Sequence, residues 1–134
     1  MAYKEIIEIL SGKKEDVIDI TPKVKDIVKK SDISEGLCLV FPMHTTSAVF
    51  INDSDFNVTD DVMNVLKKLV PDGDYKHVDS KNNAEGHIKS TLVGHHVTLP
   101  VSDGKLDLGQ YQTIYYAEFD GMRKKEILVK VIGE

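Results

Sequence analysis

The sequence lacks the features that mark secreted, membrane-spanning and nucleic-acid-binding proteins. Its single cysteine, Cys38, cannot form an internal disulfide, and within "LCLVF" we expect it to be a buried small hydrophobic residue. No apolar run approaches the ~20 residues of a membrane-spanning helix, and the acid-containing N-terminus "MAYKEIIEIL" is unlike a signal peptide. The formal net charge of −5 opposes binding to nucleic acid, which requires a basic face. We therefore expect a cytoplasmic protein without a membrane or nucleic-acid partner.

Short motifs of known chemistry are also missing. The chain has no glycine-rich phosphate loop, no HExxH pattern for zinc, and no carboxylate pair with evident spacing for Mg²⁺. Any active site must therefore be assembled from residues that are distant in the sequence.

The length of 134 residues and the apolar pattern predict one domain, residues 1–134, of the α+β class. We expect a compact, mainly antiparallel sheet with two or three helices packed on it. Strands are predicted at 3–10, 16–20, 37–41, 48–51, 96–101, from the Asp103-Gly104 turn to Phe119, and at 126–132. Because 37–41 and 48–51 are continuously apolar, each should be covered on both faces. Two Asp-Gly pairs, at 103–104 and 120–121, are typical of hairpins.

Three segments have helical signals. Thr21-Pro22 is a typical start, and a second helix should begin near Asp55–Thr59 and stop at Pro71. A third, short helix is expected between Asn83 and Gly94, although Gly86 lies inside it.

The polar triplet His44-Thr45-Thr46 stands between two apolar runs. Such side chains at the joint of two buried strands must find hydrogen-bond partners or face a cavity. The triplet is therefore either a polar turn or one wall of a functional site.

Three of the five histidines could converge on that joint: His44, His77 and His87. Three imidazoles can hold a divalent metal, and they can equally act as acid–base or phosphate-binding groups or be unrelated. Spacings of 33 and 10 residues do not decide between these readings. His95 and His96 point to opposite faces of a strand, so at most one could join a common site.

Other polar residues have an ordinary reading beside a functional one. Asn83 is either a helix cap or, four residues before His87 on one helical face, a residue that orients His87 or a ligand. Asn52 is a typical turn former and Asp60 a typical helix-start charge, and Gln112 has no distinctive position.

A charged group in "EFDGMRKK" flanks the second Asp-Gly turn. Glu118, Asp120 and Arg123 are surface charges in the ordinary reading, although Arg123 could hold a phosphate with two parallel hydrogen bonds.

Taken in order, "HTTSAVFIND", "YKHVD", "NAEGH", "LVG", "LPVSDGKLDLGQYQ" and "EFDGMR" closely resemble the YjbQ-like family, also called the secondary thiamine-phosphate synthase family. The resemblance runs from about Leu37 to Arg123. Departures are Asp53 in place of a usual glutamate, Tyr111 of tryptophan, Met122 of proline and Lys125 of arginine.

The resemblance implies a compact α+β domain that forms homotrimers, with a polar pocket near a subunit interface. It also implies a weak thiamine-phosphate synthase activity, which couples a hydroxymethylpyrimidine diphosphate to a thiazole phosphate. The recurring polar residues of the family match His44, Thr45, Thr46, Asn52, Asp60, His77, Asn83, His87, Gln112, Glu118, Asp120 and Arg123 in this chain.

We accordingly expect an enzyme acting on a small anionic or phosphorylated molecule, with His44, His77, His87 and Asp60 as catalytic residues. The ligand would be bound by Thr45, Thr46, Asn52, Asn83, Gln112, Glu118, Asp120 and Arg123. A divalent metal, zinc or magnesium, is a further expectation, with the three histidines as its ligands.

The alternative is a non-catalytic homotrimer that binds a metal or small ligand. We expect the aromatic run from Tyr111 to Tyr116 to supply the surplus apolar surface for the trimer.

Overall fold

The computed structural model describes residues 1–77 and 83–134, which form an α+β domain of two antiparallel sheets and three helices. The elements follow in the order β1 (Ala2–Leu10), β2 (Asp16–Asp19), α1 (Thr21–Ser31), β3 (Gly36–Pro42), β4 (Ser47–Asp53), α2 (Phe56–Leu69), α3 (Ala84–Val93), β5 (Val97–Ser102), β6 (Lys105–Leu106), β7 (Gln112–Glu118) and β8 (Lys124–Gly133). The expected fold class is confirmed.

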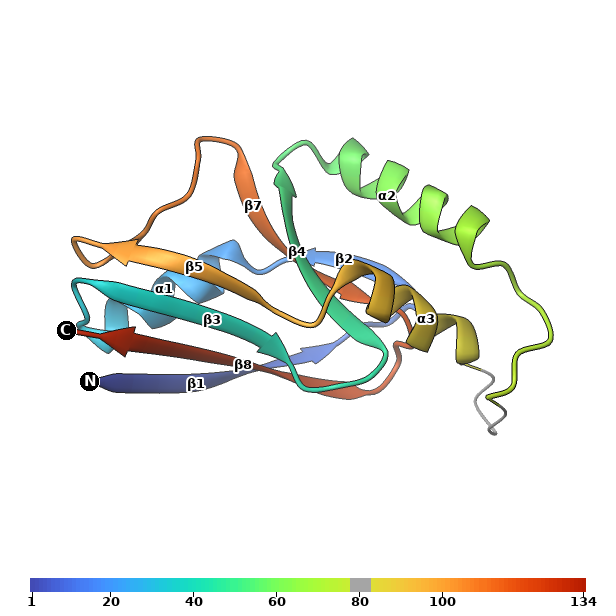
Figure 1. The fold of residues 1–134 in the computed structure, drawn as a ribbon, viewed down its shortest axis with the longest axis horizontal. Coiled ribbons are helices and arrows are strands. Elements are labelled where there is room, and N and C mark those ends of the chain that lie inside the picture. Colours follow the sequence, from blue (N-terminus) through green and yellow to red (C-terminus); the bar gives the residue numbers. More distant parts are fainter. Residues whose placement is uncertain (78–82) are drawn as a thin grey trace.

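The two sheets have the strand orders β1-β8-β3-β5-β6 and β2-β7-β4, and all pairs are antiparallel. The described strands alternate between the sheets at six connections, and three of these, β1 to β2, β3 to β4, and β7 to β8, are linked to one another by backbone hydrogen bonds. Figure 1 shows both termini at one end of the five-stranded sheet, while α2 and α3 lie toward the other end. The three linked connections are where polar residues of distant segments can meet.

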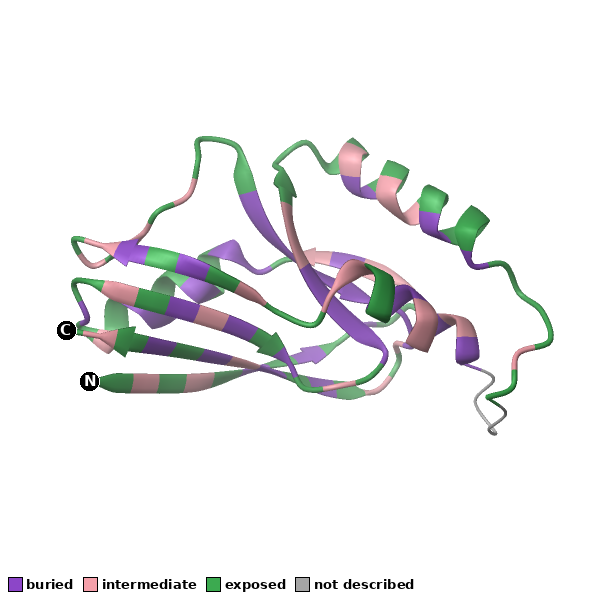
Figure 2. Ribbon diagram, in the orientation of Figure 1, coloured by how far each residue is buried: buried purple, intermediate pink, exposed green. Residues whose placement is uncertain are grey.

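The main core lies between the inner face of the five-stranded sheet, α1 and the three-stranded sheet. Strand β8 contributes Ile127, Val129 and Val131 from alternate positions, as one-sided burial requires. Helix α1 adds Val24 and Val28 at helical spacing. Figure 2 shows the alternation of buried and exposed positions along these strands.

A second, smaller core lies on the opposite face of the three-stranded sheet. Ala48 of β4 and Ala117 of β7 pack there with Leu66 of α2 and with Phe119. Helix α2 starts as expected, because the Asp55 side chain accepts a hydrogen bond from the backbone N–H of Asn57. With cores on both sides, β4 is covered on both faces over Ala48 and Val49, as predicted.

The prediction that β3 is also covered on both faces is wrong for the single chain. Leu37 and Phe41 are 47% and 38% exposed, whereas Cys38 and Val40 on the other face are fully buried. The five-stranded sheet has α1 and the second sheet on one face only, so its other face leaves alternate apolar side chains in solvent.

The two Asp-Gly turns have different outcomes. Asp103-Gly104 joins β5 and β6 in a two-residue hairpin, with positive φ at both residues. The hairpin predicted at Asp120-Gly121 is wrong, because β7 and β8 belong to different sheets. The strand predicted from 105 to 119 is likewise broken between β6 and β7.

The close packing of helix α3 explains why it contains Gly86. A Cβ added at Gly86 would lie 2.8 Å from the carbonyl oxygen of Phe119, closer than real Cβ contacts come. The glycine thus lets α3 lie directly on the segment after β7.

Two further expectations concern surfaces. Within 1–77 and 83–134, no helix is long and apolar enough to cross a membrane. The residues from Thr113 to Tyr116 are buried inside the single chain, in the central strand of the small sheet, and only Tyr111 and Gln112 of that run are exposed. The run therefore does not provide the surplus surface that was expected of it.

Candidate functional site

The His44-Thr45-Thr46 triplet forms the connection between β3 and β4, where the chain leaves the large sheet for the small one. The β7–β8 connection crosses at the same place: the Phe119 N–H donates to the Thr46 carbonyl oxygen at 3.0 Å. Two segments more than 70 residues apart in the sequence thus meet at this joint.

The His44 imidazole is held through its Nδ1 atom. The Thr46 backbone N–H donates to Nδ1 at 3.1 Å, and the Thr46 hydroxyl oxygen lies 2.9 Å from the same atom. Because a backbone N–H can only donate, Nδ1 must be the unprotonated acceptor, and the neutral ring carries its proton on Nε2.

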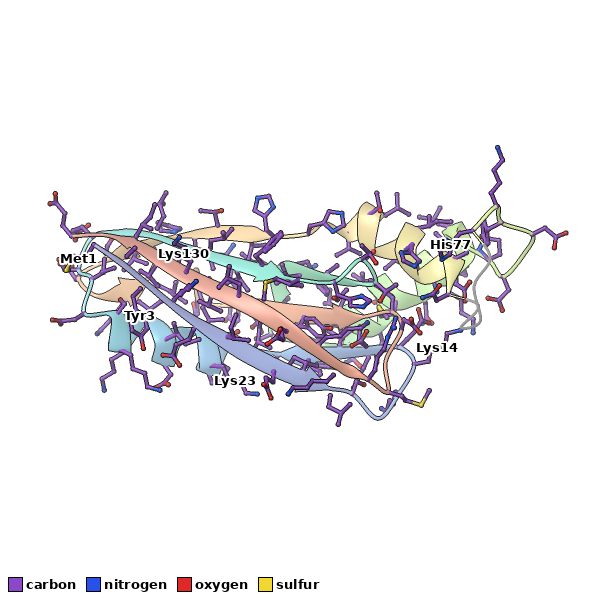
Figure 3. The ribbon with its side chains drawn as sticks, turned by 90° about the horizontal axis from the view of Figure 1, so that it is seen from below. Met1, Tyr3, Lys14, Lys23, His77 and Lys130 are labelled. Atoms are coloured by element: carbon purple, nitrogen blue, oxygen red, sulfur yellow. The ribbon has the colours of Figure 1, made fainter. Side chains whose placement is uncertain are left out.

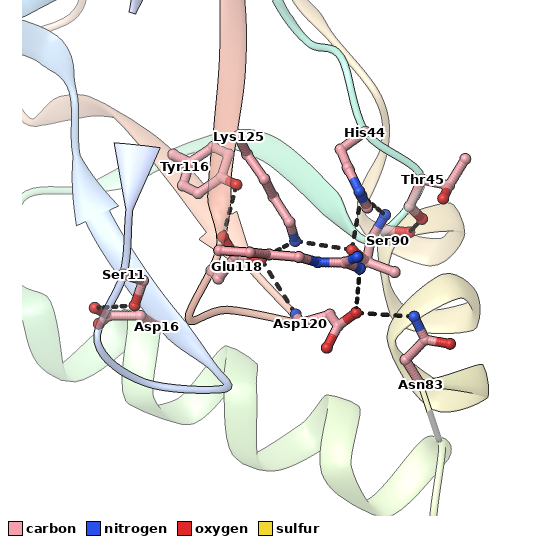
Figure 4. Close-up of polar contacts among 12 residues, drawn as sticks. Ser11, Asp16, His44, Thr45, Asn83, Ser90, Tyr116, Glu118, Asp120 and Lys125 are labelled. Atoms are coloured by element: carbon pink, nitrogen blue, oxygen red, sulfur yellow. Dashed lines mark hydrogen bonds and ion pairs between the residues drawn. The ribbon is translucent and has the colours of Figure 1, made fainter. Parts of the chain in front are cut away.

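Behind Thr46 lies a fully buried lysine. Lys125 Nζ donates to the Thr46 hydroxyl oxygen at 2.8 Å and forms an ion pair with Glu118 Oε2. The side chains of Lys125 and Glu118 are both 0% exposed. Figure 4 shows this lysine between the carboxylate and the triplet.

The Glu118 carboxylate is fixed by several donors. Besides Lys125, the Tyr116 hydroxyl donates to Oε1 at 2.9 Å and the Asp120 N–H donates to Oε2 at 3.2 Å. With both oxygens engaged and no exposed area, Glu118 lies behind the surface that a ligand could touch.

Asp120 organises the other half of the site. Its Oδ2 atom pairs with Arg123 NH2 and accepts a hydrogen bond of 2.8 Å from Asn83 Nδ2. Asn83 thus bonds across to the β7–β8 connection, and its side chain does not cap α3. The helix-cap reading is therefore wrong, and the side chain instead holds the Asp120 carboxylate.

Two polar atoms of this half have no hydrogen-bond partner in the part of the chain described. They are Nε of Arg123 and Oδ1 of Asn83, both buried. A buried donor and a buried acceptor without partners are costly, and they are suited to groups of a bound molecule.

The electrostatics of the site favour a neutral imidazole between charged neighbours. Burial, with the positive charges of Lys125 and Arg123, lowers the pKa of His44. Burial also lowers the pKa of Lys125, although Glu118 opposes this. Burial alone would raise the pKa of Asp120, but the bond from Asn83 and the charges of Arg123 and Lys125 together lower it.

Helix α3 is fastened to the triplet by one hydroxyl. Ser90 donates to the Thr45 carbonyl oxygen at 2.6 Å and to the His87 carbonyl oxygen at 3.0 Å. His87 lies one turn earlier on this helix, and its ring contacts that of His77 with 4.7 Å between ring centroids and an interplanar angle of 66°. Figure 3 shows His77 at the end of the molecule opposite Met1.

The structure therefore joins two of the three candidate histidines by direct ring contact. Within the described residues, no group of three His, Cys, Asp or Glu side chains is arranged to hold a metal ion. The pair of imidazoles could supply two nitrogen ligands at most.

A hollow of about 260 Å³ opens beside the triplet. It is lined by Phe41, Pro42, Met43, His44, Thr45 and His95. Of the adjacent pair His95-His96, only His95 lines it. Both residues are exposed and precede β5, so the expectation that they lie in a strand is wrong.

Three other candidates lie elsewhere on the single chain. Asn52 and Gln112 line a separate hollow of about 370 Å³ at the far end of the small sheet. Asn52 lies five positions after Ser47 along β4, which is about 17 Å. Asp60 is exposed on the first part of α2, a different element again.

Sequence reasoning missed Lys125, Tyr116 and Ser90 as parts of the site. A signal for Lys125 was present, because residues 125, 127, 129 and 131 form the buried stripe of β8 and three of them are apolar. A lysine in the apolar phase of a strand must be paired. Nothing in the local sequence marks Tyr116 or Ser90.

Comparison with known proteins agrees with this arrangement over the whole chain. The family model described as UPF0047 protein YjbQ-like matches residues 5–134. A UPF0047 protein of Archaeoglobus fulgidus is 40% identical over 127 residues, covering 94% of this chain and 98% of the relative. One from Methanothermobacter thermautotrophicus is 37% identical over 133 residues, covering 98% and 93%.

Solved structures give the same result. A YbjQ-like protein of unknown function from Sulfolobus solfataricus superimposes with a TM-score of 0.95 at 32% identity, covering 100% of this chain and 99% of its own. An uncharacterised UPF0047 protein from Clostridium acetobutylicum has a TM-score of 0.90 at 40% identity, covering 96% and 99%. With the ordered motifs, the family model and these full-length matches in agreement, the chain belongs to the YjbQ-like (UPF0047) family.

Proposed function

We propose that this protein is a small-molecule enzyme whose substrate is phosphorylated or otherwise anionic, bound at the joint of β3 and β4. Thiamine-phosphate synthase activity, the coupling of a hydroxymethylpyrimidine diphosphate to a thiazole phosphate with release of diphosphate, is the reaction to test first. The single observation that carries the proposal is a neutral imidazole held by its Nδ1 atom close to a guanidinium with a free buried donor.

The charges near the site cancel in pairs, Lys125 with Glu118 and Arg123 with Asp120. A ligand is therefore recognised through directed hydrogen bonds more than through net positive charge. The remaining N–H groups of Arg123, which is 30% exposed, suit a phosphate oxygen.

His44 suits a leaving or transferring oxygen. Its Nε2–H donates without a net charge on the ring, so it stabilises developing negative charge on diphosphate in a partly desolvated site. Thr45, whose side chain is exposed at the hollow, is suited to a second contact. The Thr46 hydroxyl is already engaged with Lys125 and His44.

A divalent metal remains part of the proposal for the histidine pair and for diphosphate chemistry. His77 and His87 would hold it, and its positive charge would offset the negative charge of the leaving diphosphate. Elemental analysis of protein purified without a metal-affinity tag measures this directly. One equivalent of zinc per chain favours a metal centre, and none assigns the pair to acid–base or phosphate-binding work.

We further propose a cytoplasmic homotrimer. The exposed face of the five-stranded sheet offers apolar side chains on three adjacent strands: Ile6 of β1, Ile132 of β8, and Leu37 and Phe41 of β3. Association through this face would bury apolar surface that a single chain leaves exposed to solvent. A mass near the 15.0 kDa of a single chain in light scattering at micromolar concentration would refute the trimer.

Association also offers a reason for the separate placement of Asn52 and Gln112. In a cyclic trimer, residues far from His44 in one chain can approach the His44 of a neighbour. A dissociated variant that kept full ligand affinity would show that the pocket lies within one subunit.

The activity test uses the purified protein with both precursors and follows diphosphate release. His87→Ala and Arg123→Gln should lose turnover, and Lys23→Gln on the exposed side of α1 is the matched control. The second candidate function, a non-catalytic binding protein, predicts a ligand that raises the melting temperature with no product formed. The unpartnered Asn83 and Arg123 atoms are compatible with that reading too.

A further inference from the structure

One fully buried carboxylate is connected to both halves of the candidate site. Glu118 Oε2 accepts a hydrogen bond from Lys125, which also donates to Thr46, the residue bonded to His44. The same oxygen accepts a hydrogen bond from the N–H of Asp120, whose side chain pairs with Arg123. Neither Glu118 nor Lys125 is exposed at all. A side chain without exposed area cannot touch a ligand, so any role of this pair must act through its neighbours.

The direction of each hydrogen bond in the chain follows from chemistry. The Lys125 ammonium can only donate, so the Thr46 oxygen is its acceptor. The Thr46 hydroxyl proton is then available for His44 Nδ1, 2.9 Å away, where the Thr46 backbone N–H also points. Two donors thus converge on one nitrogen lone pair.

Stability alone is a poor explanation for this ion pair. Burying two charges costs several kcal/mol per ion before their attraction is counted, and an apolar pair of similar volume is often equally stable. This series of hydrogen bonds is also not a proton path to solvent. It ends inside the protein at Glu118, which accepts a hydrogen bond from the buried hydroxyl of Tyr116. What the pair provides is orientation.

We infer that Lys125, held by Glu118, is the positioning residue that makes the Thr46 hydroxyl a donor and so fixes the His44 ring with Nε2–H facing outward. Glu118 couples that ring to the Asp120–Arg123 pair, so the imidazole and the guanidinium are set relative to one carboxylate. The catalytic consequence rests on the proposed function, but the geometry does not.

The test measures the His44 tautomer and therefore needs no substrate. Two-bond ¹H–¹⁵N correlations of the imidazole at about pH 8, above its ordinary pKa, report which nitrogen carries the proton. The wild type should show His44 protonated on Nε2. In Thr46→Val and in the double variant Lys125→Met/Glu118→Gln, the Nδ1–H fraction should rise about fivefold, the equivalent of one net hydrogen bond.

Two controls separate positioning from a general effect on the fold. Thr46→Ser keeps the hydroxyl and should restore the wild-type pattern. The double variant Lys89→Met/Glu15→Gln removes another pair with a buried lysine, 2.8 Å apart, and should leave His44 unchanged.

A wild-type His44 protonated on Nδ1 would overturn the inference, as would a wild-type spectrum in either Thr46→Val or folded Lys125→Met/Glu118→Gln. If the double variant does not fold, the Thr46→Val spectrum decides alone. Absence of synthase turnover with the expected spectra would refute the proposed function and leave the positioning role intact.

Discussion

Replacing Lys125 by methionine should be among the most destabilising single changes in this chain. The substitution keeps the length of the side chain but leaves Glu118, which is fully buried, without its cation. Its remaining donors are the Tyr116 hydroxyl and the Asp120 N–H. Removing one partner of a buried ion pair costs about 3–5 kcal/mol, because the other charge stays desolvated and unpaired.

That loss is a large share of the roughly 5–15 kcal/mol that stabilises a typical domain. The midpoint of thermal unfolding should fall by roughly 10–20 °C for a chain of this length. Urea denaturation at one fixed protein concentration, followed by circular dichroism, gives the free energy of unfolding for each variant. Glu118→Gln/Lys125→Met removes both charges together and should cost far less than the single change.

The matched control is the exposed pair of Lys30 and Asp26 on α1, 3.0 Å apart with both side chains more than half exposed. Lys30→Met should change the free energy of unfolding by less than about 0.5 kcal/mol. A loss below about 1 kcal/mol for Lys125→Met would refute the reasoning, since it would mean that water or another cation replaces the lysine.

Three other predictions concern single residues. Below about pH 6.5 the free energy of unfolding should fall. His44 takes up a proton near its ordinary pKa when unfolded, whereas burial and the charges of Lys125 and Arg123 keep its pKa lower in the folded protein. His44→Gln should flatten this dependence on pH in urea titrations. Gly86→Ala should destabilise by about 1–3 kcal/mol in the same assay despite the helix propensity of alanine, because its Cβ would meet the Phe119 carbonyl, and a stabilised variant would contradict this. Cys38, fully buried with a pKa raised by burial to about 11, should react with a thiol reagent only on unfolding, so rapid labelling of native protein would disprove its placement.

Local sequence patterns correctly predicted the features that depend only on residues close together in the sequence. The turn at Asp103-Gly104 depends on neighbouring residues and was predicted from the sequence, as was a helix start near Asp55–Thr59, where Asp55 caps α2. Asp120-Gly121 has the same two residues but no hairpin, because β8 pairs with β1 and β3 in the other sheet. Pairing between distant strands is a tertiary choice that a dipeptide does not encode.

The sequence predicted where the candidate site lies, but not which contacts its side chains make. The polar triplet between apolar runs indicated the joint, and the ordered family motifs added Asn83, Asp120 and Arg123, which the structure connects there. The Thr46 hydroxyl, expected to face an anion, is bonded to His44 and Lys125, since only the three-dimensional register of β8 brings that lysine to it.

The burial of β3 shows a limit of a different kind. A continuously apolar strand is expected to be covered on both faces. In the single chain, however, the face of β3 that carries Leu37 and Phe41 is exposed to solvent. Burial within the single chain therefore does not account for the apolar pattern of β3. This is the physical reason why the exposed sheet face, and not the buried aromatic run in β7, supports the proposed trimer.

The central claim, that a small phosphorylated molecule binds at the joint of β3 and β4, is tested most directly by NMR titration with inorganic diphosphate. The account predicts saturable shifts of the His44 imidazole and Arg123 guanidinium signals. The His44 shift should disappear in Arg123→Gln and be unchanged in the exposed Lys23→Gln. Shifts that are absent, or that persist unaltered in Arg123→Gln, would contradict it.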